Sequence, residues 1–340
     1  MSLRCQCLLL NQDEILQVGA TDIHFLLEAV EEGFRLHGLG DCTNPPKVKL
    51  GRPGKPRDLV MALPGYLGGD YHMFGCKWVL AIPDNVERGI PRSSGLIVLN
   101  DGETGWPLCV MDGTIVNIVR TGAVSGVGAR YLARPDSSRI CLIGAGPQGR
   151  MQVAALAAVL PLKEVEVFDL VRERAEQAAA YLAETLGLSA RAVDDPKPAV
   201  QAADVVVTAT IAHDPYLAWD WLRPGTFYVD MASHDAYPEV YLRADKVIVD
   251  DWRQLKEHGT GTLPEMYAAG QIKDDDIYGE LGEVVVGAKE GRRSPDEIIV
   301  FKHIGIAATD LPVAAGIYRR ARERELGTSW TVWEKPWSAM

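Results

Sequence analysis

The first third of the chain mixes helical and strand-like patterns of apolar residues. Apolar side chains recur at helical spacing from Ile23 to Phe34, directly after Asp22, which predicts an amphipathic helix with Asp22 as its N-cap. Prolines and glycines recur between Asn44 and Gly69, and Asp101-Gly102 is typical of a hairpin turn. Runs that predict strands lie within residues 1–10, 58–63, 76–80, 95–99 and 108–111. We therefore expect an α+β domain with a mostly antiparallel sheet.

From about Arg120 the pattern changes to strands that alternate with helices. Continuously apolar strands are predicted at residues 140–143, 164–168, 204–208, 227–230 and 246–250, with helical segments between them. Strands that are apolar on both faces are typical of a parallel sheet covered by helices on both sides. The second region is therefore predicted to be a doubly wound nucleotide-binding domain.

A glycine-rich turn follows the first of these strands. Residues 144–149 read Gly-Ala-Gly-Pro-Gln-Gly, with a strand before them and a helical segment after them. In such a turn Gly144 permits the tight bend, Gly146 lets the backbone approach a pyrophosphate, and Gly149 lets the helix pack closely on the strand. The amides of the helix N-terminus, which include those near Pro147 and Gln148, favour an anion. We predict that these residues bind a dinucleotide.

The residue at the end of the next strand indicates whether the protein prefers NAD or NADP. Asp169 lies about 20 residues after the last glycine, where a carboxylate accepts hydrogen bonds from the adenosine ribose. It favours NAD, because a 2′-phosphate would meet a negative charge, although Arg172 and Arg174 leave NADP possible. Thr208 and Thr210 end a later apolar strand and are further candidates for cofactor contacts, although surface hydroxyls are common.

Composition and charge exclude several classes of protein. A formal net charge of −11 argues against an extended phosphate-binding surface, so no nucleic-acid partner is expected. The apolar runs are far shorter than the ~20 residues of a membrane-spanning helix. The six cysteines lack metal-ligand spacing, so we expect no metal and reduced thiols. Polar residues 11–14 follow the apolar N-terminus where a secretory leader would have its cleavage site, and we expect a cytoplasmic protein.

Four segments resemble the ornithine cyclodeaminase and mu-crystallin superfamily, and the resemblance extends over nearly the whole chain. They are residues 111–114, 120–123, the glycine-rich turn and residues 282–287. Residues 111–138 are most similar to archaeal alanine dehydrogenases, and residues 83–85, 89–92 and 238–240 to opine-type dehydrogenases of diaminopropionate biosynthesis. The resemblance implies an α/β protein with a Rossmann domain at 121–314 and a substrate and dimerisation domain at 1–120 and 315–340. It also implies a homodimer and a small-molecule amino acid or imine substrate held between the domains.

The resemblance also implies substrate-binding cations. Lys77 matches the family's substrate lysine and is a catalytic candidate, because an ammonium there can bind a carboxylate or polarise a carbonyl, unless it is simply an outward-facing lysine. Its flanking Cys76 and Trp78 should lie on the other face of a half-buried strand. Lys47 matches a lysine near the substrate in alanine dehydrogenases, although a basic residue in a proline-rich loop is ordinarily on the surface. Arg120 matches an arginine whose guanidinium binds a substrate carboxylate through two hydrogen bonds or lies beside the cofactor. The alternative is that Arg120 only makes a salt bridge that joins the domains.

Asp235 is the candidate catalytic carboxylate. It matches the aspartate of the opine-type relatives, in the loop where the cyclodeaminases carry theirs, and can transfer the proton that accompanies hydride transfer. Asp230, nearer the strand end, and His234, which an ungapped alignment to alanine dehydrogenase favours, remain alternatives.

Three residues depart from the family pattern and bear on the substrate. Met61 replaces a glutamate or arginine, so the pocket is expected to take a larger or less polar side chain, unless Met61 is a core residue. Arg92 suits a second carboxylate, as in an opine product, or is simply exposed. His303 occupies a position usually held by serine, and we count it among the substrate-binding candidates.

The leading hypothesis is a homodimeric NAD(P)-dependent oxidoreductase that acts on the C–N bond of an amino acid or imine. Its activity would be that of an amino acid dehydrogenase, an imine reductase or an opine-type dehydrogenase. The first alternative is an ornithine or lysine cyclodeaminase that releases ammonia and regenerates its NAD. Met61 weakens this alternative for ornithine, because it cannot pair with a side-chain ammonium. A lesser alternative is a non-catalytic ligand-binding protein like mu-crystallin.

Overall fold

The computed structural model describes residues 4–337, so Met1 to Leu3 of the predicted first strand lie outside the described residues. The chain divides into two compact units, residues 1–120 with 306–340 and residues 121–305. No helix among residues 4–337 is long and apolar enough to cross a membrane.

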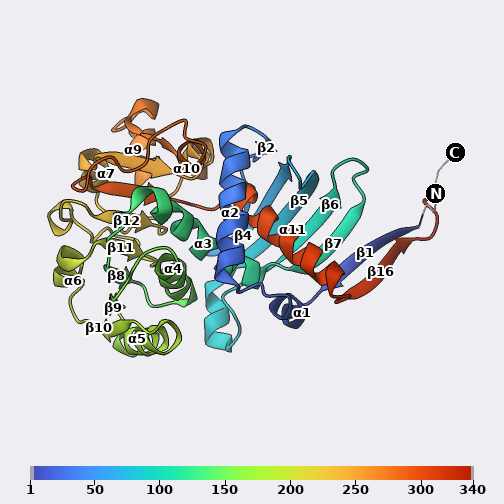
Figure 1. The fold of residues 1–340 in the computed structure, drawn as a ribbon, viewed down its shortest axis with the longest axis horizontal. Helices are drawn as coiled ribbons and strands as arrows, with labels where there is room; N and C mark the ends of the chain where they lie inside the picture. Colours follow the sequence, from blue (N-terminus) through green and yellow to red (C-terminus); the bar gives the residue numbers. More distant parts are fainter. Residues whose placement is uncertain (1–3, 338–340) are drawn as a thin grey trace. The chain divides into compact units, whose positions relative to one another are not determined.

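The first unit is built on an eight-stranded sheet in the order β16-β1-β7-β6-β5-β4-β2, with β3 paired to β4 (Figure 1). Strands β1 and β7 run parallel and the other neighbours antiparallel, as predicted. Its elements are β1 (Cys5–Leu10), α1 (Gln12–Gln17), α2 (Ile23–Gly38), β2 (Cys42–Thr43), β3 (Val48–Arg52), β4 (Lys55–Leu67), β5 (Met73–Ala81), η1 (Pro83–Arg88), β6 (Ser93–Asp101), β7 (Pro107–Asp112), α11 (Ala307–Glu323) and β16 (Thr328–Trp333).

Helices α2 and α11 pack on one face of this sheet and on each other (Figure 1). Asp22 caps α2 by accepting a hydrogen bond from the amide of His24 at 3.1 Å, which confirms the predicted helix start. A Cβ on Gly33 would lie 1.9 Å from the carbonyl oxygen of Ala308, so the close approach of the two helices requires glycine there. We predicted that the chain returns to the first domain at residue 315. Helix α11 already packs on β4, β5 and α2 from this unit, so the return begins at Ile306.

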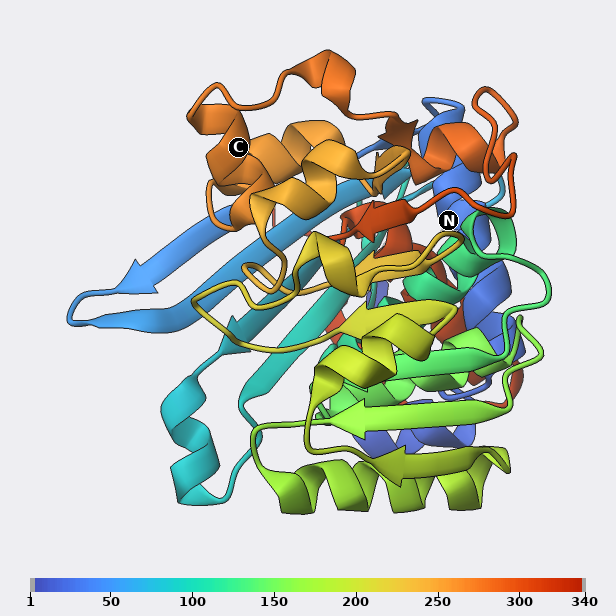
Figure 2. The ribbon, with the colours of Figure 1, turned by 90° about the vertical axis from the view of Figure 1, so that its left-hand side faces the viewer.

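The segment from residue 44 to residue 69 is more ordered than its prolines and glycines suggested. Strands β3 and β4 form a long hairpin (Figure 2), whereas only residues 58–63 were predicted to be a strand. Pro64 is tolerated inside β4 because it lies between Ala62, which pairs with β3, and Tyr66, which pairs with β2. Gly54, at φ 73°, makes the turn of the hairpin.

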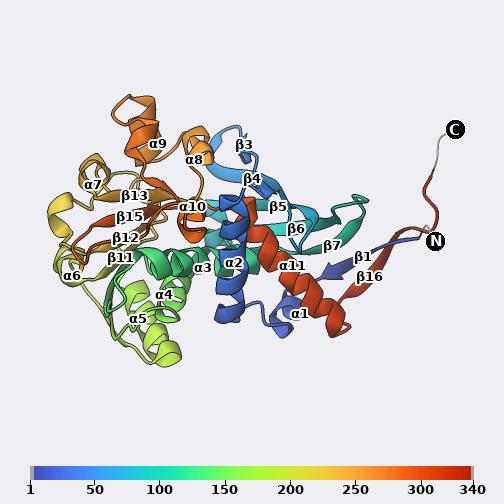
Figure 3. The same ribbon diagram turned by 45° about the horizontal axis from the view of Figure 1, so that its top comes forward.

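The second unit contains a parallel eight-stranded sheet in the order β10-β9-β8-β11-β12-β15-β13-β14, covered on both faces by helices (Figure 3). This confirms the predicted doubly wound domain. Its elements are β8 (Arg139–Ile143), α4 (Pro147–Ala157), β9 (Glu164–Phe168), α5 (Arg172–Leu186), β10 (Ser189–Ala192), α6 (Pro196–Ala202), β11 (Val205–Thr208), η2 (Trp219–Trp221), β12 (Phe227–Asp230), α7 (Pro238–Arg243), β13 (Lys246–Val249), α8 (Trp252–His258), α9 (Thr262–Ala268), η3 (Asp274–Asp276), β14 (Gly279–Glu280), α10 (Leu281–Val285) and β15 (Ile299–Lys302). Helix α3 (Thr114–Leu132) continues from the first unit into the second.

Candidate active site

The glycine-rich turn joins β8 to α4 with the geometry that a dinucleotide needs. Gly144 has φ 103°, and a Cβ there would lie 2.6 Å from the carbonyl oxygen of Ala209. A Cβ on Gly149 would lie 2.1 Å from the carbonyl oxygen of Gly144, so helix and turn pack closely. A Cβ on Gly146 would meet no atom within 4 Å. Only Gly146, the N-cap of α4, therefore faces open space, as expected of the glycine that lets a pyrophosphate approach.

The first turn of α4 leaves donors for an anion. Gly146 has no side chain to cap the helix, and Pro147 and Gln148 follow it in the first turn. An uncapped helix N-terminus presents backbone amides and the positive end of the helix dipole. These features fit the diphosphate of NAD.

Asp169 follows β9 and holds the glycine-rich turn. Its carboxylate accepts hydrogen bonds from the amide of Ala145 at 2.9 Å and from that of Val171 at 3.0 Å. Arg172, which could have favoured NADP, is engaged by Glu176 at 2.9 Å and by Asp194 at 2.7 Å. The carboxylate next to the turn and the neutralised arginine fit NAD better than NADP. Arg174 is exposed in the first turn of α5.

The two candidate threonines after β11 have different surroundings. Thr208 is fully buried, and its hydroxyl lies 2.9 Å from the hydroxyl of Tyr228, so its side chain is used in the core. Thr210 donates a hydrogen bond to Asp235 at 2.6 Å and accepts one from the amide of Ala212 at 3.0 Å. Thr210 therefore orients the candidate catalytic carboxylate, a contact that the sequence did not predict.

Asp235 is a buried carboxylate beside the hydroxyls of Thr210 and Tyr216. Its Oδ1 accepts the bond from Thr210, whereas its Oδ2 is buried and has no hydrogen-bond partner among the described residues. Burial raises the pKa of Asp235, and the negative charge of Asp230 adds to the increase, although the hydroxyls of Thr210 and Tyr216 oppose it. The backbone amides of Tyr216 and Leu217 fix the carbonyl of Asp235 at 3.0 and 2.9 Å. This combination suits a carboxyl group that gives and takes a proton.

The two alternatives to Asp235 have other partners. Asp230 is fully buried, receives a hydrogen bond from Tyr241, and lies 3.3 Å from the ammonium of Lys302. His234 lies 2.9 Å from the carboxylate of Glu265. Asp230 therefore takes part in a buried ion pair, although its Oδ1, like Oδ2 of Asp235, has no hydrogen-bond partner among the described residues. His234 takes part in a partly exposed ion pair. The choice of Asp235 as the catalytic carboxylate stays a prediction.

In the first unit, Lys77 belongs to a buried cluster of charged residues. Its ammonium lies 2.7 Å from Oδ1 of Asp310, and the same oxygen lies 2.8 Å from Nε of Arg120. Asn117 accepts hydrogen bonds from Lys77 at 2.9 Å and from Arg120 at 3.0 Å. Lys77, Arg120 and Asp310 are at most 5% exposed, so the cluster lies in a low-dielectric environment.

The charges in this cluster do not cancel. Burial lowers the pKa of Lys77 to about 7, and repulsion from Arg120 and Lys47 adds to the decrease, although Asp310 opposes it. Nη1 of Arg120 is buried and has no hydrogen-bond partner among the described residues. A buried guanidinium with one unbonded nitrogen, beside a lysine that shares its carboxylate, is suited to bind a further carboxylate.

The strand alternation around Lys77 is as predicted. Phe74 and Trp78 are exposed on one face of β5, whereas Lys77 and Val79 face the helices on the other. Met61 pairs with Val79 across the strands and therefore shares the face of Lys77. It is only partly buried, so it is not a fully enclosed core residue.

The remaining candidates are scattered. Lys47 lies close enough to influence the pKa of Lys77. Arg92 is exposed just before β6, and no contact places it with Lys77. His303 is buried, and its ring lies 3.1 Å from the hydroxyl of Ser125 in the second unit. The roles of these three residues in substrate binding stay predictions.

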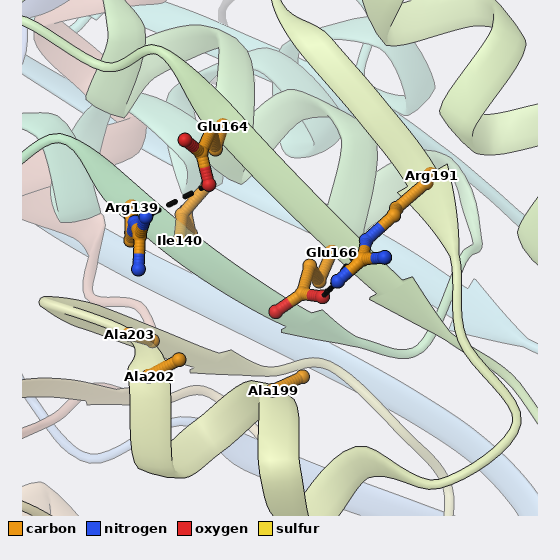
Figure 4. Close-up of a pocket in the computed structure, with 8 residues that line it drawn as sticks. All are labelled: Arg139, Ile140, Glu164, Glu166, Arg191, Ala199, Ala202 and Ala203. Carbon is orange, nitrogen blue, oxygen red and sulfur yellow. Dashed lines mark hydrogen bonds and ion pairs between the residues drawn. The ribbon is translucent and has the colours of Figure 1, made fainter.

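A pocket of about 150 Å³ in the second unit is unsuited to the cofactor (Figure 4). It lies at the amino ends of β8 and β9, whereas the glycine-rich turn follows the carboxyl end of β8. Its charges are neutralised within the pocket, because Arg139 pairs with Glu164 at 3.2 Å and Arg191 with Glu166. Ligand pockets are usually larger, about 300–1,000 Å³.

Comparison with known proteins identifies the kind of enzyme. The model of the ornithine cyclodeaminase/mu-crystallin family matches residues 11–325. An alanine dehydrogenase from Archaeoglobus fulgidus is 36% identical over 330 residues, which cover 95% of this chain and 98% of that protein. An N-((2S)-2-amino-2-carboxyethyl)-L-glutamate dehydrogenase from Staphylococcus aureus is 32% identical with the same coverage. A solved archaeal alanine dehydrogenase dimer with bound NAD has a TM-score of 0.88 at 33% identity and covers 96% of this chain and 100% of that one.

Proposed function

The chain belongs to the ornithine cyclodeaminase/mu-crystallin family and is an NAD-dependent oxidoreductase, and we propose that it transfers a hydride between NAD and the α-carbon of an amino acid or imino acid. The buried cluster of Lys77, Arg120 and Asp310 carries this proposal. The cluster contains two cations, Lys77 and Arg120, that share one carboxylate, Asp310. The carboxylate of an α-amino or α-imino acid can therefore bind to these two cations.

Lys77 and Arg120 would orient the substrate. A carboxylate that binds them completes the hydrogen bonding of the Arg120 guanidinium and adds the negative charge that Lys77 lacks. Such binding fixes the α-carbon to which the carboxylate is attached, and fixed geometry supplies a large part of the catalysis of bimolecular reactions. Asn117 and Asp310 would hold both cations in place before the substrate arrives.

Asp235 would move the proton. In the oxidative direction its ionised form accepts a proton from the substrate ammonium or from the attacking water, and in the reductive direction its acid form returns one. Its raised pKa favours the acid form relative to that of an exposed aspartate. Bound NAD(H) supplies the hydride acceptor or donor, for which Gly146 and the N-terminus of α4 provide the diphosphate site.

The proposal extends to assembly and location. Phe74, Trp78 and Leu96 are exposed large apolar residues on the sheet face away from α11, which suits a subunit interface. The similar archaeal enzyme was solved as a dimer, and we propose a homodimer here as well. All six cysteines are free, which agrees with the reducing cytoplasm.

Loss of absorbance at the reduced-nicotinamide band tests the proposed function. The purified enzyme is mixed with NADH and a panel of 2-oxo acids and cyclic imines, each with and without ammonia or an amino acid. We expect stoichiometric loss of NADH with at least one combination, and loss of turnover but retention of NADH binding in Lys77→Met. If a diamino acid instead released ammonia without net change in NADH, the enzyme would be a cyclodeaminase and the proposal would be wrong.

A further inference from the structure

The loop between β11 and η2 is joined through its backbone to the loop that carries Asp235. The amides of Tyr216 and Leu217 donate hydrogen bonds to the carbonyl oxygen of Asp235 at 3.0 and 2.9 Å. In the same region the amide of Tyr237 donates to the carbonyl oxygen of Leu217 at 3.1 Å, and Leu217 forms a parallel β-bridge with Ala236. These backbone contacts hold Tyr216 beside Asp235.

The ring of Tyr216 packs against the hydrophobic core of the second unit, which includes Leu217 and Ala236. Its hydroxyl is buried and has no hydrogen-bond partner in the described part of the chain. This hydroxyl lies close enough to the carboxylate of Asp235 for each group to influence the pKa of the other. Burial raises the pKa of Tyr216, and the charge of Asp235 adds to the increase, so the phenol keeps its proton and remains a hydrogen-bond donor.

Thr210 and Tyr216 place two hydroxyl groups at one carboxylate. Thr210 accepts a hydrogen bond from the amide of Ala212 at 3.0 Å and donates its own proton to Oδ1 of Asp235 at 2.6 Å. Oδ2 of Asp235, like the hydroxyl of Tyr216, is buried and lacks a hydrogen-bond partner among residues 4–337. An unsatisfied buried donor and an unsatisfied buried acceptor are both costly, and a hydrogen bond to an ionised carboxylate is stronger than one between neutral groups. A hydrogen bond from Tyr216 to Oδ2 would therefore satisfy both atoms and favour the ionised form of Asp235.

Other titratable groups of the second unit also surround Asp235. They are Asp230, Lys302, Tyr228, Tyr241 and the adjacent His234 with its partner Glu265. Burial and the charge of Asp230 favour the acid form of Asp235, whereas the two hydroxyls and the ammonium of Lys302 favour its ionised form. Burial raises the pKa of Tyr228 and of Tyr241, so both stay uncharged. Opposing influences of this kind make the protonation of Asp235 sensitive to the loss of a single hydroxyl.

We propose that Tyr216 is a positioning residue that donates a hydrogen bond to the ionised carboxylate of Asp235 and thereby extends amino acid oxidation to lower pH. This inference rests on the proposed function, because it takes Asp235 to accept the proton of the substrate ammonium. Tyr216 keeps its own proton throughout, so the proton passes only between the substrate and Asp235. In the reductive direction the same contact makes the acid form of Asp235 a stronger proton donor.

Carbon-13 NMR of the NAD-loaded enzyme tests the contact without turnover. The protein is labelled at the side-chain carboxyl carbon of aspartate, and the signal of Asp235 is identified by its loss in Asp235→Asn. The variant Tyr216→Phe keeps the ring that packs on the core and removes only the hydroxyl. Tyr237→Phe is the control, because Tyr237 is an exposed tyrosine two residues after Asp235.

We expect the titration midpoint of Asp235 to rise by about one pH unit in Tyr216→Phe, because the ionised form loses a hydrogen bond, and to stay unchanged in Tyr237→Phe. The acid limb of the pH profile of kcat/KM for amino acid oxidation should move to higher pH by the same amount. An unchanged midpoint in Tyr216→Phe, or an equal shift in Tyr237→Phe, would overturn the proposal. A shifted midpoint with an unchanged pH profile would instead contradict the proton-transfer role of Asp235 in the proposed function.

Discussion

Oδ1 of Asp310 lies 2.7 Å from the ammonium of Lys77 and 2.8 Å from Nε of Arg120, so one buried oxygen serves two cations. A buried charge pair is costly unless its groups are fully compensated. Here the compensation is incomplete, because one carboxylate faces two cations and the guanidinium keeps an unpartnered nitrogen. A substrate carboxylate would supply the missing negative charge and accept a hydrogen bond from the guanidinium. Substrate binding should therefore stabilise the cluster.

The affinity for carboxylate ligands should fall as the pH rises through about 7. The ammonium form of Lys77 binds the ligand, and its pKa in the free enzyme is lowered to about 7, so the protonated fraction decreases above that pH. We expect the affinity for 2-hydroxypentanoate, which does not titrate in this range, to decrease up to tenfold per pH unit. In Lys77→Arg the decrease should disappear, because arginine stays charged. A wild-type affinity that is constant from pH 6 to 9 would contradict this assignment.

Asp310→Asn should alter the titration of Lys77 as well as stability. Loss of the carboxylate removes the influence that raises the pKa of Lys77, so the fall in ligand affinity should move to lower pH. Two buried cations also lose their partner, which should lower the free energy of unfolding by about 3–5 kcal/mol. Urea denaturation and the pH profile of ligand affinity measure the two effects. Stability loss with an unchanged pH profile would show that Asp310 is only structural.

Asp235→Asn and Asp230→Asn should have different effects. Loss of the proton-transfer group at Asp235 should lower kcat about 10²- to 10⁴-fold and leave NADH affinity unchanged. Asp230→Asn should chiefly lower stability, because the buried ammonium of Lys302 loses its carboxylate. Steady-state kinetics, NADH fluorescence titration and thermal melting separate the two results. If Asp230→Asn reduced kcat without loss of stability while Asp235→Asn was active, the roles would be reversed.

Two alanine substitutions in the glycine-rich turn form a matched pair. In Gly146→Ala the new Cβ meets open space at an ordinary φ of −67°, so stability should be retained while NADH affinity falls at least about tenfold. In Gly149→Ala the Cβ would lie 2.1 Å from the carbonyl oxygen of Gly144, so the protein itself should be destabilised. Thermal melting and NADH titration test both. Unchanged NADH affinity in Gly146→Ala would argue against the proposed diphosphate site.

Local patterns predicted the cofactor domain, and the family resemblance pointed to Lys77, but neither indicated the contacts that Lys77 makes. The glycine-rich turn is a local strand-turn-helix signal, so sequence alone could place it. Asp310 lies on α11, 233 residues after Lys77 in the sequence, so no local pattern relates the two residues. Asn117, three residues before Arg120 on α3, could have been found from helical spacing.

Isotope transfer from the cofactor tests the central claim of hydride transfer to the α-carbon most directly. The enzyme is given NADH with deuterium at the transferable position, together with the best 2-oxo acid and amine of the panel. We predict one deuterium at the α-carbon of the product by mass spectrometry, with one NAD formed for each product molecule. A product without deuterium, or ammonia release with no net oxidation of NADH, would contradict the account.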